Sequence, residues 1–342
     1  MDACGQVVGS QVLDPVQRLD GSHHAVSFAY ATVGARGEPR TATASLHLPA
    51  GVERPPVLVF CHGTSGVGEQ CAVSFGLAAW MGEDLAAWTA AGLAVLAVDY
   101  AGLGSPGPHA YLHARSTAFQ VVDALRAAHL LADLDPRWVA MGGSQGGHAA
   151  LAASSYAVGR ADGLDLRGVV AQAPPTDLTL LLRAAGPWVP RLPVPDLVAY
   201  LAYILHGLEA ARPELRPLLD DLLTDDGREL VDSSPWYAYQ ELVARTRGRS
   251  VGSMTRRGLR GTEVLRAVGE TSTLPAVRHP APVLVQQGVL DPVVPVFGTH
   301  RYVRRCRRAG SSITHRVYPA AHAVWPAARA EALRFSVERM AE

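Results

Sequence analysis

The chain of 342 residues is 48% hydrophobic and 18% charged, and its 31 basic and 31 acidic residues cancel to a formal net charge of zero. This composition is typical of an ordinary globular protein and excludes the strongly basic surface with which proteins bind nucleic acid. Every basic residue is arginine, which also excludes a Schiff-base lysine, a P-loop lysine and a Ser-Lys pair. The length fits two domains, or one α/β domain that carries an insertion.

The N-terminal stretch "MDACGQVVGSQVLD" has neither the basic start nor the apolar run of a secretory signal. We therefore expect a cytoplasmic location for the chain as given, or secretion if a signal precedes it. No run of about 18 apolar residues predicts a membrane span. The cysteines are too few and too scattered for a zinc site or a disulfide framework. A bridge from Cys4 or Cys61 to Cys71 stays open for an exported protein, and Cys306 is expected to be an idle thiol.

Two stretches with alternating apolar residues, 25–33 and 41–49, predict an antiparallel hairpin. Five continuous apolar runs further along predict strands that are buried on both faces of a parallel sheet. These runs are 55–63, 93–100, 137–144, 167–175 and 281–291. Helical patterns at 82–92, 116–134, 146–159 and 326–342 separate or follow them. The alternation predicts a doubly wound α/β protein with a mostly parallel central sheet flanked by helices.

From about residue 176 to 277 this alternation stops, because the segment holds leucine-rich helical pieces and no convincing buried strand. We interpret it as a helical insertion between an N-terminal part of the core, 1–175, and a C-terminal part, 278–342. It follows a predicted strand and so emerges at the carboxyl ends of the strands, where such sheets bind ligands. We predict that it caps a substrate pocket and that its aromatic residues Trp188, Tyr200 and Tyr203 contact the substrate.

In "WVAMGGSQGGHAAL", residues 138–151, an apolar run ends in glycines around one serine, and an alanine-rich helix follows. Gly142 and Gly146 place Ser144 in a Gly-x-Ser-x-Gly pattern, in which a sharp strand-to-helix turn presents the serine hydroxyl. A residue in such a turn needs neighbours without side chains. Ser144 is therefore a candidate nucleophile. A glycine-rich turn with an ordinary capping serine is the alternative interpretation.

A serine nucleophile needs a histidine base and a carboxylate that orients it, in the chain order Ser, Asp, His for this kind of sheet. Asp291 directly follows the predicted strand 281–291, and His322 follows the strand-like run 313–319. Asp99 also follows a buried strand and is the second choice for the acid, with backbone hydrogen bonding as its expected role. Other histidines are expected to be structural or to line the pocket: His62, His109, His113 and His148.

The oxyanion of an acyl-transfer intermediate needs backbone amides, one from the residue after the nucleophile and one from the loop after an earlier strand. Gln145 supplies the first. The stretch "VLVFCHGTSGVG" supplies the second, and we favour the Thr64 amide because small neighbours let the backbone approach the substrate. Gly63 and Ser65 are accordingly expected to contact the substrate. The spacing of a phosphate-binding glycine loop does not occur in this stretch.

Several longer motifs resemble the secretory lipase family of α/β-hydrolases, the lipase A-like group found in actinobacteria. They are "HGTSGVGEQCAVS", "VDYAGLGSPGPHAYL", "GGSQGGHAAL", "AQAPPTDL" and "LDPVVPV", and together they extend over most of the chain. The resemblance implies the α/β-hydrolase fold, hydrolysis of carboxylic esters by a triad of Ser144, Asp291 and His322, and a helical cap over the acyl pocket.

We therefore predict a serine esterase or lipase that acts through an acyl-enzyme on a small-molecule or lipid ester, without a metal or cofactor. An acyltransferase is the main alternative, since an alcohol or amine can resolve the same acyl-enzyme when a cap excludes water. A third hypothesis is a binding protein that has lost catalysis, although each triad position is occupied by a suitable residue. The sequence contains no signal for the acyl length, the alcohol or the oligomeric state.

Overall fold

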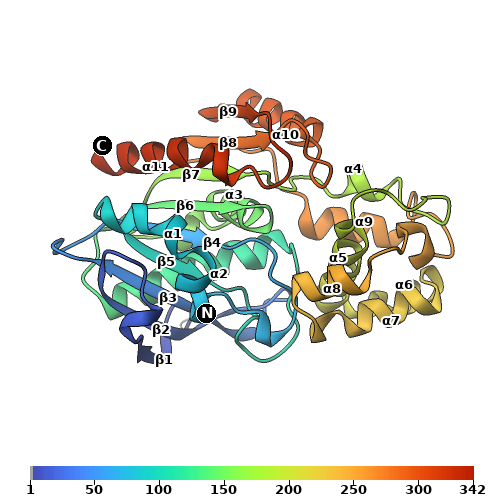
Figure 1. Cartoon of the computed structure of the whole chain (residues 1–342), viewed down its shortest axis with the longest axis horizontal. Helices are drawn as coiled ribbons and strands as arrows, with labels where there is room; N and C mark the ends of the chain where they lie inside the picture. The colour runs from blue at the N-terminus through green and yellow to red at the C-terminus, as the bar shows by residue number, and fades with distance from the viewer. Residues whose placement is uncertain (1–2) are drawn as a thin grey trace.

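A computed structural model describes residues 3–342, and within them the strands form one continuous sheet (Figure 1). The strands are β1 (Val7–Val12), β2 (Ser22–Val33), β3 (Pro39–Pro49), β4 (Val57–Cys61), β5 (Ala94–Val98), β6 (Arg137–Gly143), β7 (Asp165–Gln172), β8 (Val283–Gly288) and β9 (Ile313–Tyr318). Their order across the sheet is β1-β2-β3-β5-β4-β6-β7-β8-β9. The pairs β1–β2, β2–β3 and β3–β5 are antiparallel, and the other neighbouring pairs are parallel.

The predicted strands are confirmed. Strands β2 and β3 form the expected hairpin, and the five continuous apolar runs form β4 to β8 at the centre of the sheet. Strand β1 was not predicted. It lies at the edge of the sheet, and every residue in it after Val7 is exposed. It therefore lacks the alternation of buried and exposed positions on which a strand prediction depends.

Helices cover both faces of the sheet. Residues alternate along β4, so that Val57, Val59 and Cys61 belong to one hydrophobic cluster and Leu58 and Phe60 to another. The first cluster includes residues of α2 (Ala114–Leu131), α3 (Gln145–Tyr156) and α10 (Val296–Arg308). The second includes residues of α1 (Leu77–Ala90) and α11 (Trp325–Ala341). The predicted α/β layering is therefore present.

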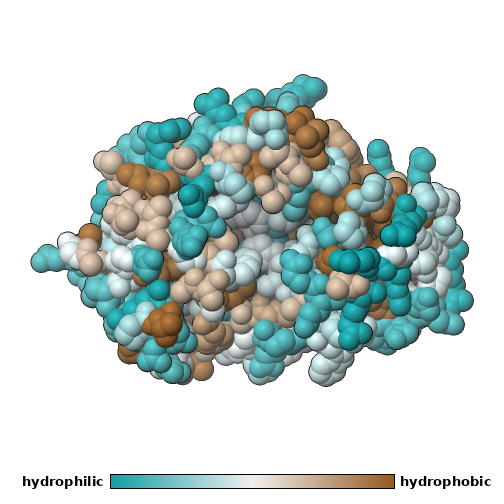
Figure 2. All heavy atoms as spheres, viewed as in Figure 1, coloured by the Kyte–Doolittle hydropathy of each residue, from teal (hydrophilic) through white to brown (hydrophobic). Residues whose placement is uncertain are grey.

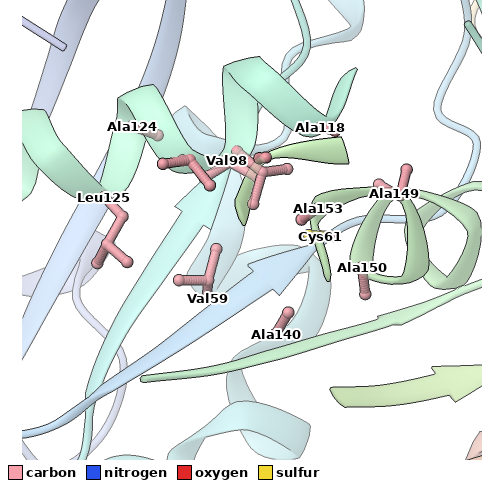
Figure 3. Packing of buried hydrophobic residues seen from close by; sticks show 14 of the residues in the cluster. Val59, Cys61, Val98, Ala118, Ala124, Leu125, Ala140, Ala149, Ala150 and Ala153 are labelled. Carbon is pink, nitrogen blue, oxygen red and sulfur yellow. The ribbon is translucent and has the colours of Figure 1, made fainter. Parts of the chain in front are cut away.

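Small side chains fill much of the first cluster. Figure 3 shows Ala149, Ala150 and Ala153 of α3 close to Cys61 of β4 and Ala140 of β6. Alanine has no side chain beyond Cβ, so the helix can pack closely against the strands. This packing holds α3 in place and with it the turn that contains Ser144.

The segment between β7 and β8 forms helices and contributes no strand to the sheet. Figure 1 shows these helices, coloured yellow-green to orange, grouped at the right-hand end of the molecule. They bury leucine and valine side chains in a hydrophobic cluster that also includes Val67, Tyr111 and Leu112 of the core. The helices are α4 (Thr179–Leu182), α5 (Asp196–Ala211), α6 (Arg216–Leu222), α7 (Asp225–Ser233), α8 (Tyr239–Arg245) and α9 (Glu263–Ser272). Short 3₁₀ turns lie at Pro213–Leu215, Ser234–Trp236 and Val251–Met254 here, and at Pro15–Gln17, Glu69–Cys71, Ser74–Gly76 and Val158–Arg160 elsewhere.

On the face shown in Figure 2, the helical insertion carries many polar side chains with apolar groups between them. None of the helices within residues 3–342 is both long enough and apolar enough to cross a membrane.

All four cysteines are free thiols, so the bridge to Cys71 that was left open is not formed. Cys61 lies at the buried end of β4, where the core surrounds its sulfur.

Candidate active site

Ser144 occupies the sharp turn between β6 and α3, with backbone angles φ 51° and ψ −117°. Non-glycine residues rarely adopt this left-handed region, and here the surrounding close packing stabilises it. A Cβ atom on either Gly142 or Gly146 would collide with the carbonyl oxygen of Cys61. Gly143 is different, because a Cβ atom there would meet the Gln172 side chain at an ordinary 3.8 Å. The two glycines of the Gly-x-Ser-x-Gly pattern are therefore required by close approach of the backbone.

The structure brings Ser144, His322 and Asp291 into one hydrogen-bonded chain. His322 Nδ1 lies 2.8 Å from Asp291 Oδ2, and His322 Nε2 lies 3.0 Å from Ser144 Oγ. The carboxylate can only accept, so Nδ1 carries the hydrogen, and Nε2 of the neutral ring accepts from the serine hydroxyl. The three residues follow β6, β8 and β9, and these parallel strands place them at the same edge of the sheet.

Asp291 is buried, and hydrogen bonds satisfy both of its oxygens. Oδ1 accepts from the amides of Val293 and Val294, each at 2.9 Å. Oδ2 accepts from the Gln287 side chain at 2.8 Å in addition to the histidine. Donors of this kind offset the cost of burying a carboxylate. They fix the Asp291 carboxylate beside the His322 ring.

Gln287 was missed by the sequence analysis. It also donates to the Val294 carbonyl at 2.9 Å and accepts from the Thr299 hydroxyl at 2.9 Å. The sequence does contain a signal for it. Two consecutive glutamines precede the last residue of the otherwise apolar strand β8, and buried polar side chains need partners.

The two predicted oxyanion residues belong to two segments that meet at the serine turn. Gln145 begins α3, and an amide at the first turn of a helix has no partner within that helix. Thr64 lies in the loop after β4, and no backbone or side-chain hydrogen bond within residues 3–342 uses its amide. This loop runs beside the serine turn, because a Cβ atom on Gly63 would lie 3.4 Å from the Gly143 carbonyl oxygen. Both amides are therefore available next to Ser144.

Asp99, the rival acid, is fully buried and has other partners. Its carboxylate accepts from the amides of Val73 and Ser74 at 2.8 and 3.1 Å, and from the Thr43 hydroxyl at 2.7 Å. His62 Nε2 lies 3.5 Å from it. These contacts match the backbone role expected for Asp99 and attach the start of the 3₁₀ turn Ser74–Gly76 to the sheet.

The remaining histidines are held in structural contacts. His148 donates from Nε2 to the Ser272 carbonyl at 2.8 Å, and His113 caps the N-terminus of α2. His109 donates from Nδ1 to the Ala101 carbonyl at 3.1 Å and accepts from the Gln145 side chain at 3.0 Å. Burial lowers the pKa of His148 to about 4 and that of His109 to about 3, so both are neutral at physiological pH.

A cavity of about 230 Å³ opens beside Ser144 and extends into the helical insertion. Its walls are almost entirely apolar. On α5 the lining positions are spaced as one helical face, and Tyr200 is among them. The lining residues are Tyr111, Leu112, Ser144, Pro175, Leu178, Leu181, Leu182, Ala184, Ala185, Val189, Leu192, Leu197, Tyr200, Leu201, Ile204, Val251, Pro292, Val293 and Val294.

Four of the five predicted contact residues lie outside this lining. Trp188 is 66% exposed and donates to the Ala184 carbonyl at 3.2 Å, so its ring lies on the outer surface of the insertion. Tyr203 is fully buried in the hydrophobic cluster of the insertion and does not line the cavity. Gly63 lies beside the serine turn, and the backbone carbonyl of Ser65 accepts a hydrogen bond from the Tyr239 amide at 2.9 Å. None of these four residues lines the cavity, and their contact with the substrate stays a prediction.

The sheet order, the serine turn between β6 and α3 and the helical segment after β7 place the protein in the α/β-hydrolase class. A sequence model of the secretory lipase family matches residues 84–341, and the chain belongs to that family. The protein is accordingly a carboxylic ester hydrolase. The resemblance in the sequence motifs is thereby confirmed.

Two solved structures illustrate how similar the fold is. LipA, a rice cell wall degrading esterase from Xanthomonas oryzae, is 19% identical with a TM-score of 0.82, and the match covers 98% of this chain and 100% of that one. Candida antarctica lipase A in its closed state is 18% identical with a TM-score of 0.74, and the match covers 94% of this chain and 78% of that one. No curated protein matches the sequence.

Proposed function

We propose that this enzyme hydrolyses esters through an acyl-enzyme on Ser144, with His322 as the base and Asp291 as the residue that orients it. One observation carries the proposal: the unbroken path of hydrogen bonds from Ser144 Oγ through the His322 ring to Asp291 Oδ2. A serine hydroxyl is a poor nucleophile at neutral pH unless a base takes its proton. This path provides such a base.

In the first half of the reaction, Ser144 Oγ attacks the ester carbonyl carbon and its proton passes to His322 Nε2. Negative charge develops on the carbonyl oxygen, and the amides of Thr64 and Gln145 are the groups placed to stabilise it. The C–O bond to the alcohol then breaks, and the imidazolium returns the proton to the departing alkoxide. Asp291 stabilises the positive charge on the ring between these two proton transfers.

In the second half, water replaces the alcohol. His322 takes a proton from the water, and the water oxygen attacks the acyl carbonyl carbon. The tetrahedral intermediate then collapses, which releases the carboxylic acid and returns the proton from His322 to Ser144. Hydrolysis is favoured over acyl transfer because the similar solved structures are an esterase and a lipase. The acyl-transfer alternative has no support from the comparisons.

The apolar cavity suggests the acyl part of the substrate. Its walls offer aliphatic and aromatic carbon, so burial favours an uncharged hydrocarbon chain and a charged acyl group would lose its hydration without compensation. The insertion, 176–277, supplies most of these walls and acts as the cap between the core segments 1–175 and 278–342. Membership of a family of secreted lipases favours action outside the cytoplasm.

The test is hydrolysis of p-nitrophenyl esters from acetate to palmitate by the wild-type enzyme and by Ser144→Ala. We expect turnover in the wild type and a loss of at least about a thousandfold in the variant, since the covalent route is removed. A fluorophosphonate probe should label only the wild type. Turnover by Ser144→Ala at the wild-type rate would contradict the assignment. Adding an alcohol to the assay separates hydrolysis from acyl transfer, because a transferase would convert most of the acyl group into a new ester.

A further inference from the structure

Residues 99–113, between β5 and α2, form hydrogen bonds with both predicted oxyanion residues or with their close neighbours in the chain. Tyr100 donates its hydroxyl to the His62 carbonyl at 2.8 Å, two residues before Thr64. His109 accepts from the Gln145 side chain at 3.0 Å. Tyr111 OH and Thr64 Oγ1 lie 2.6 Å apart. The last of these contacts is the shortest of the three.

Tyr111 lines the same cavity as Ser144, and only 5% of its surface is exposed. Within residues 3–342 its hydroxyl has one hydrogen-bond partner, Thr64 Oγ1. A phenol is more acidic than an aliphatic alcohol and is the better donor of the two. When the phenol donates, its hydrogen occupies one lone pair of Thr64 Oγ1, and the Thr64 O–H is free to donate elsewhere.

We propose that Tyr111 is a positioning residue for the oxyanion hole: its hydroxyl donates to Thr64 Oγ1 and directs the Thr64 hydroxyl hydrogen toward the oxyanion formed above Ser144. Thr64 thereby contributes two donors, its amide and its hydroxyl. The inference rests on the proposed acyl-enzyme function, since an oxyanion forms only if Ser144 attacks a carbonyl.

The position of Tyr111 is tightly determined. A Cβ atom on Gly207 of α5 would collide with the Tyr111 backbone, so the helix of the insertion packs directly on this residue. The Tyr203 ring centroid lies 5.9 Å from that of Tyr111 on the same side. The next residue, Leu112, has φ 58°, a left-handed conformation that leucine rarely adopts. Contacts from the core and the insertion together hold the Tyr111 hydroxyl against Thr64.

This arrangement links the insertion to the chemistry. The same helix that lines the cavity with Tyr200 and Ile204 packs on Tyr111 through Gly207. A hydrogen-bond donor that is already oriented stabilises the oxyanion without the cost of reorganisation during the reaction. Loss of Tyr111 OH should therefore affect the transition state more than substrate binding.

The experiment compares Tyr111→Phe, Thr64→Val and the double variant, with Tyr203→Phe as the matched control. Tyr203 is a buried tyrosine beside Tyr111 that donates to the Tyr237 carbonyl at 3.3 Å and does not line the cavity. We measure kcat and KM for one p-nitrophenyl ester, the inhibition constant of a trifluoromethyl ketone, and the melting temperature of each variant.

We expect Tyr111→Phe to lower kcat roughly tenfold or more and to leave KM within about twofold, because removal of a single oxyanion donor costs about 10²–10³ in kcat and misalignment costs less. The ketone, which forms a tetrahedral adduct, should bind more weakly by a similar factor. Thr64→Val should also lower kcat, and adding Tyr111→Phe to it should change kcat by less than about twofold. Tyr203→Phe should keep the wild-type kcat.

Two results would overturn the inference. One is a Tyr111→Phe variant whose kcat and ketone affinity equal those of Tyr203→Phe. The other is independent, multiplicative losses in the double variant, which would mean that Tyr111 does not act through the Thr64 hydroxyl. Either result leaves the proposed function intact, because that function fails only if Ser144→Ala retains activity.

Discussion

Gln287 donates its side-chain amide to the same oxygen of Asp291 that accepts the His322 ring hydrogen, at 2.8 Å in both cases. The carboxylate is thus held from the strand side by Gln287 and from the loop side by the amides of Val293 and Val294. Since α10 follows this loop, one residue of β8 ties the acid, the loop and the start of a helix together.

Replacing Gln287 by methionine should therefore lower kcat by roughly tenfold, because Asp291 loses a donor and the loop that orients it is released. The change also leaves the Thr299 hydroxyl without its acceptor and should reduce the free energy of unfolding by about 1–3 kcal/mol. Gln286→Met is the matched control. Gln286 is equally buried but bonds Tyr318 and the Ala328 carbonyl, so its loss should reduce stability and spare kcat. Equal kcat values for the two variants would contradict the role given to Gln287.

Substitution of the two buried aspartates, Asp291 and Asp99, should have different effects on kcat and on stability. Asp291→Asn should lower kcat on the order of 10⁴-fold, because an amide in place of the carboxylate favours the wrong tautomer of His322. Asp99→Asn should instead lower the free energy of unfolding by about 1–3 kcal/mol, because the amides of Val73 and Ser74 lose a charged acceptor. Kinetics on the folded protein and urea unfolding distinguish the two effects. The reverse pattern would make Asp99 the catalytic acid.

The serine turn predicts that alanine is tolerated differently at Gly143 and at Gly146, which flank Ser144. Gly146→Ala should destabilise the protein by more than about 3 kcal/mol or prevent folding, because its Cβ would overlap the Cys61 carbonyl in the core. Gly143→Ala should cost less than about 1 kcal/mol, because a Cβ there meets its nearest neighbour at 3.8 Å. Thermal melting of both variants measures the difference. A stable Gly146→Ala protein would show that the turn can widen.

Stability should fall as the pH falls from about 6.5 to about 4. Burial lowers the pKa of His148 to about 4, whereas in the unfolded chain a histidine titrates near 6.5. Above that value both states are neutral at this residue. Below it, the unfolded chain binds a proton that the folded protein does not, and unfolding is favoured by about 1.4 kcal/mol per pH unit for each such group. His109 acts in the same direction.

Urea unfolding between pH 4 and 7.5 tests this dependence. His148→Gln should keep a donor for the Ser272 carbonyl and remove the titrating group. The free energy of unfolding should therefore depend less steeply on pH in the variant, by about 1.4 kcal/mol per unit within the window. An unchanged slope would mean that His148 is protonated in the folded protein.

The cavity predicts how the acyl preference can be changed. Ile204→Trp places a larger side chain in the apolar space and should shift the preferred p-nitrophenyl ester toward shorter acyl chains. The rate of labelling by a small fluorophosphonate should stay within about threefold, because the reacting groups of Ser144 and His322 are unchanged. Trp188→Ala is the control: its ring lies outside the cavity, and the preference should not move. A shift in the control alone would place the acyl site on the outer surface.

Much of the fold could be predicted from the sequence, because the signals are local. Five strands buried on both faces appear as continuous apolar runs, and the elbow appears as glycines around one serine. The order of Ser144, Asp291 and His322, each just after a strand-like run, was enough to select the residues that the structure brings together. Parallel strands carry their carboxyl ends to one edge, so position along each strand predicts proximity in space.

Other features depend on contacts between segments that are distant in the chain. Strand β1 exists because β2 offers it an edge, and its own exposed residues carry no pattern. Tyr111 reaches Thr64 across 47 positions in the sequence, and Gly207 allows the insertion to pack on it. Tyr200 faces the cavity and Tyr203 does not, because the packing of α5 against its neighbours decides which of its sides meets the core.

Local backbone preferences and the spacing of apolar residues are written in the sequence, and they determined the strands, the serine turn and the chemical groups of this hydrolase. Which side chains surround those groups was decided only when the sheet, the 99–113 segment and the insertion packed together. Packing selects among positions that look alike in the sequence, because it is set by shape and by the pairing of buried polar groups between distant segments.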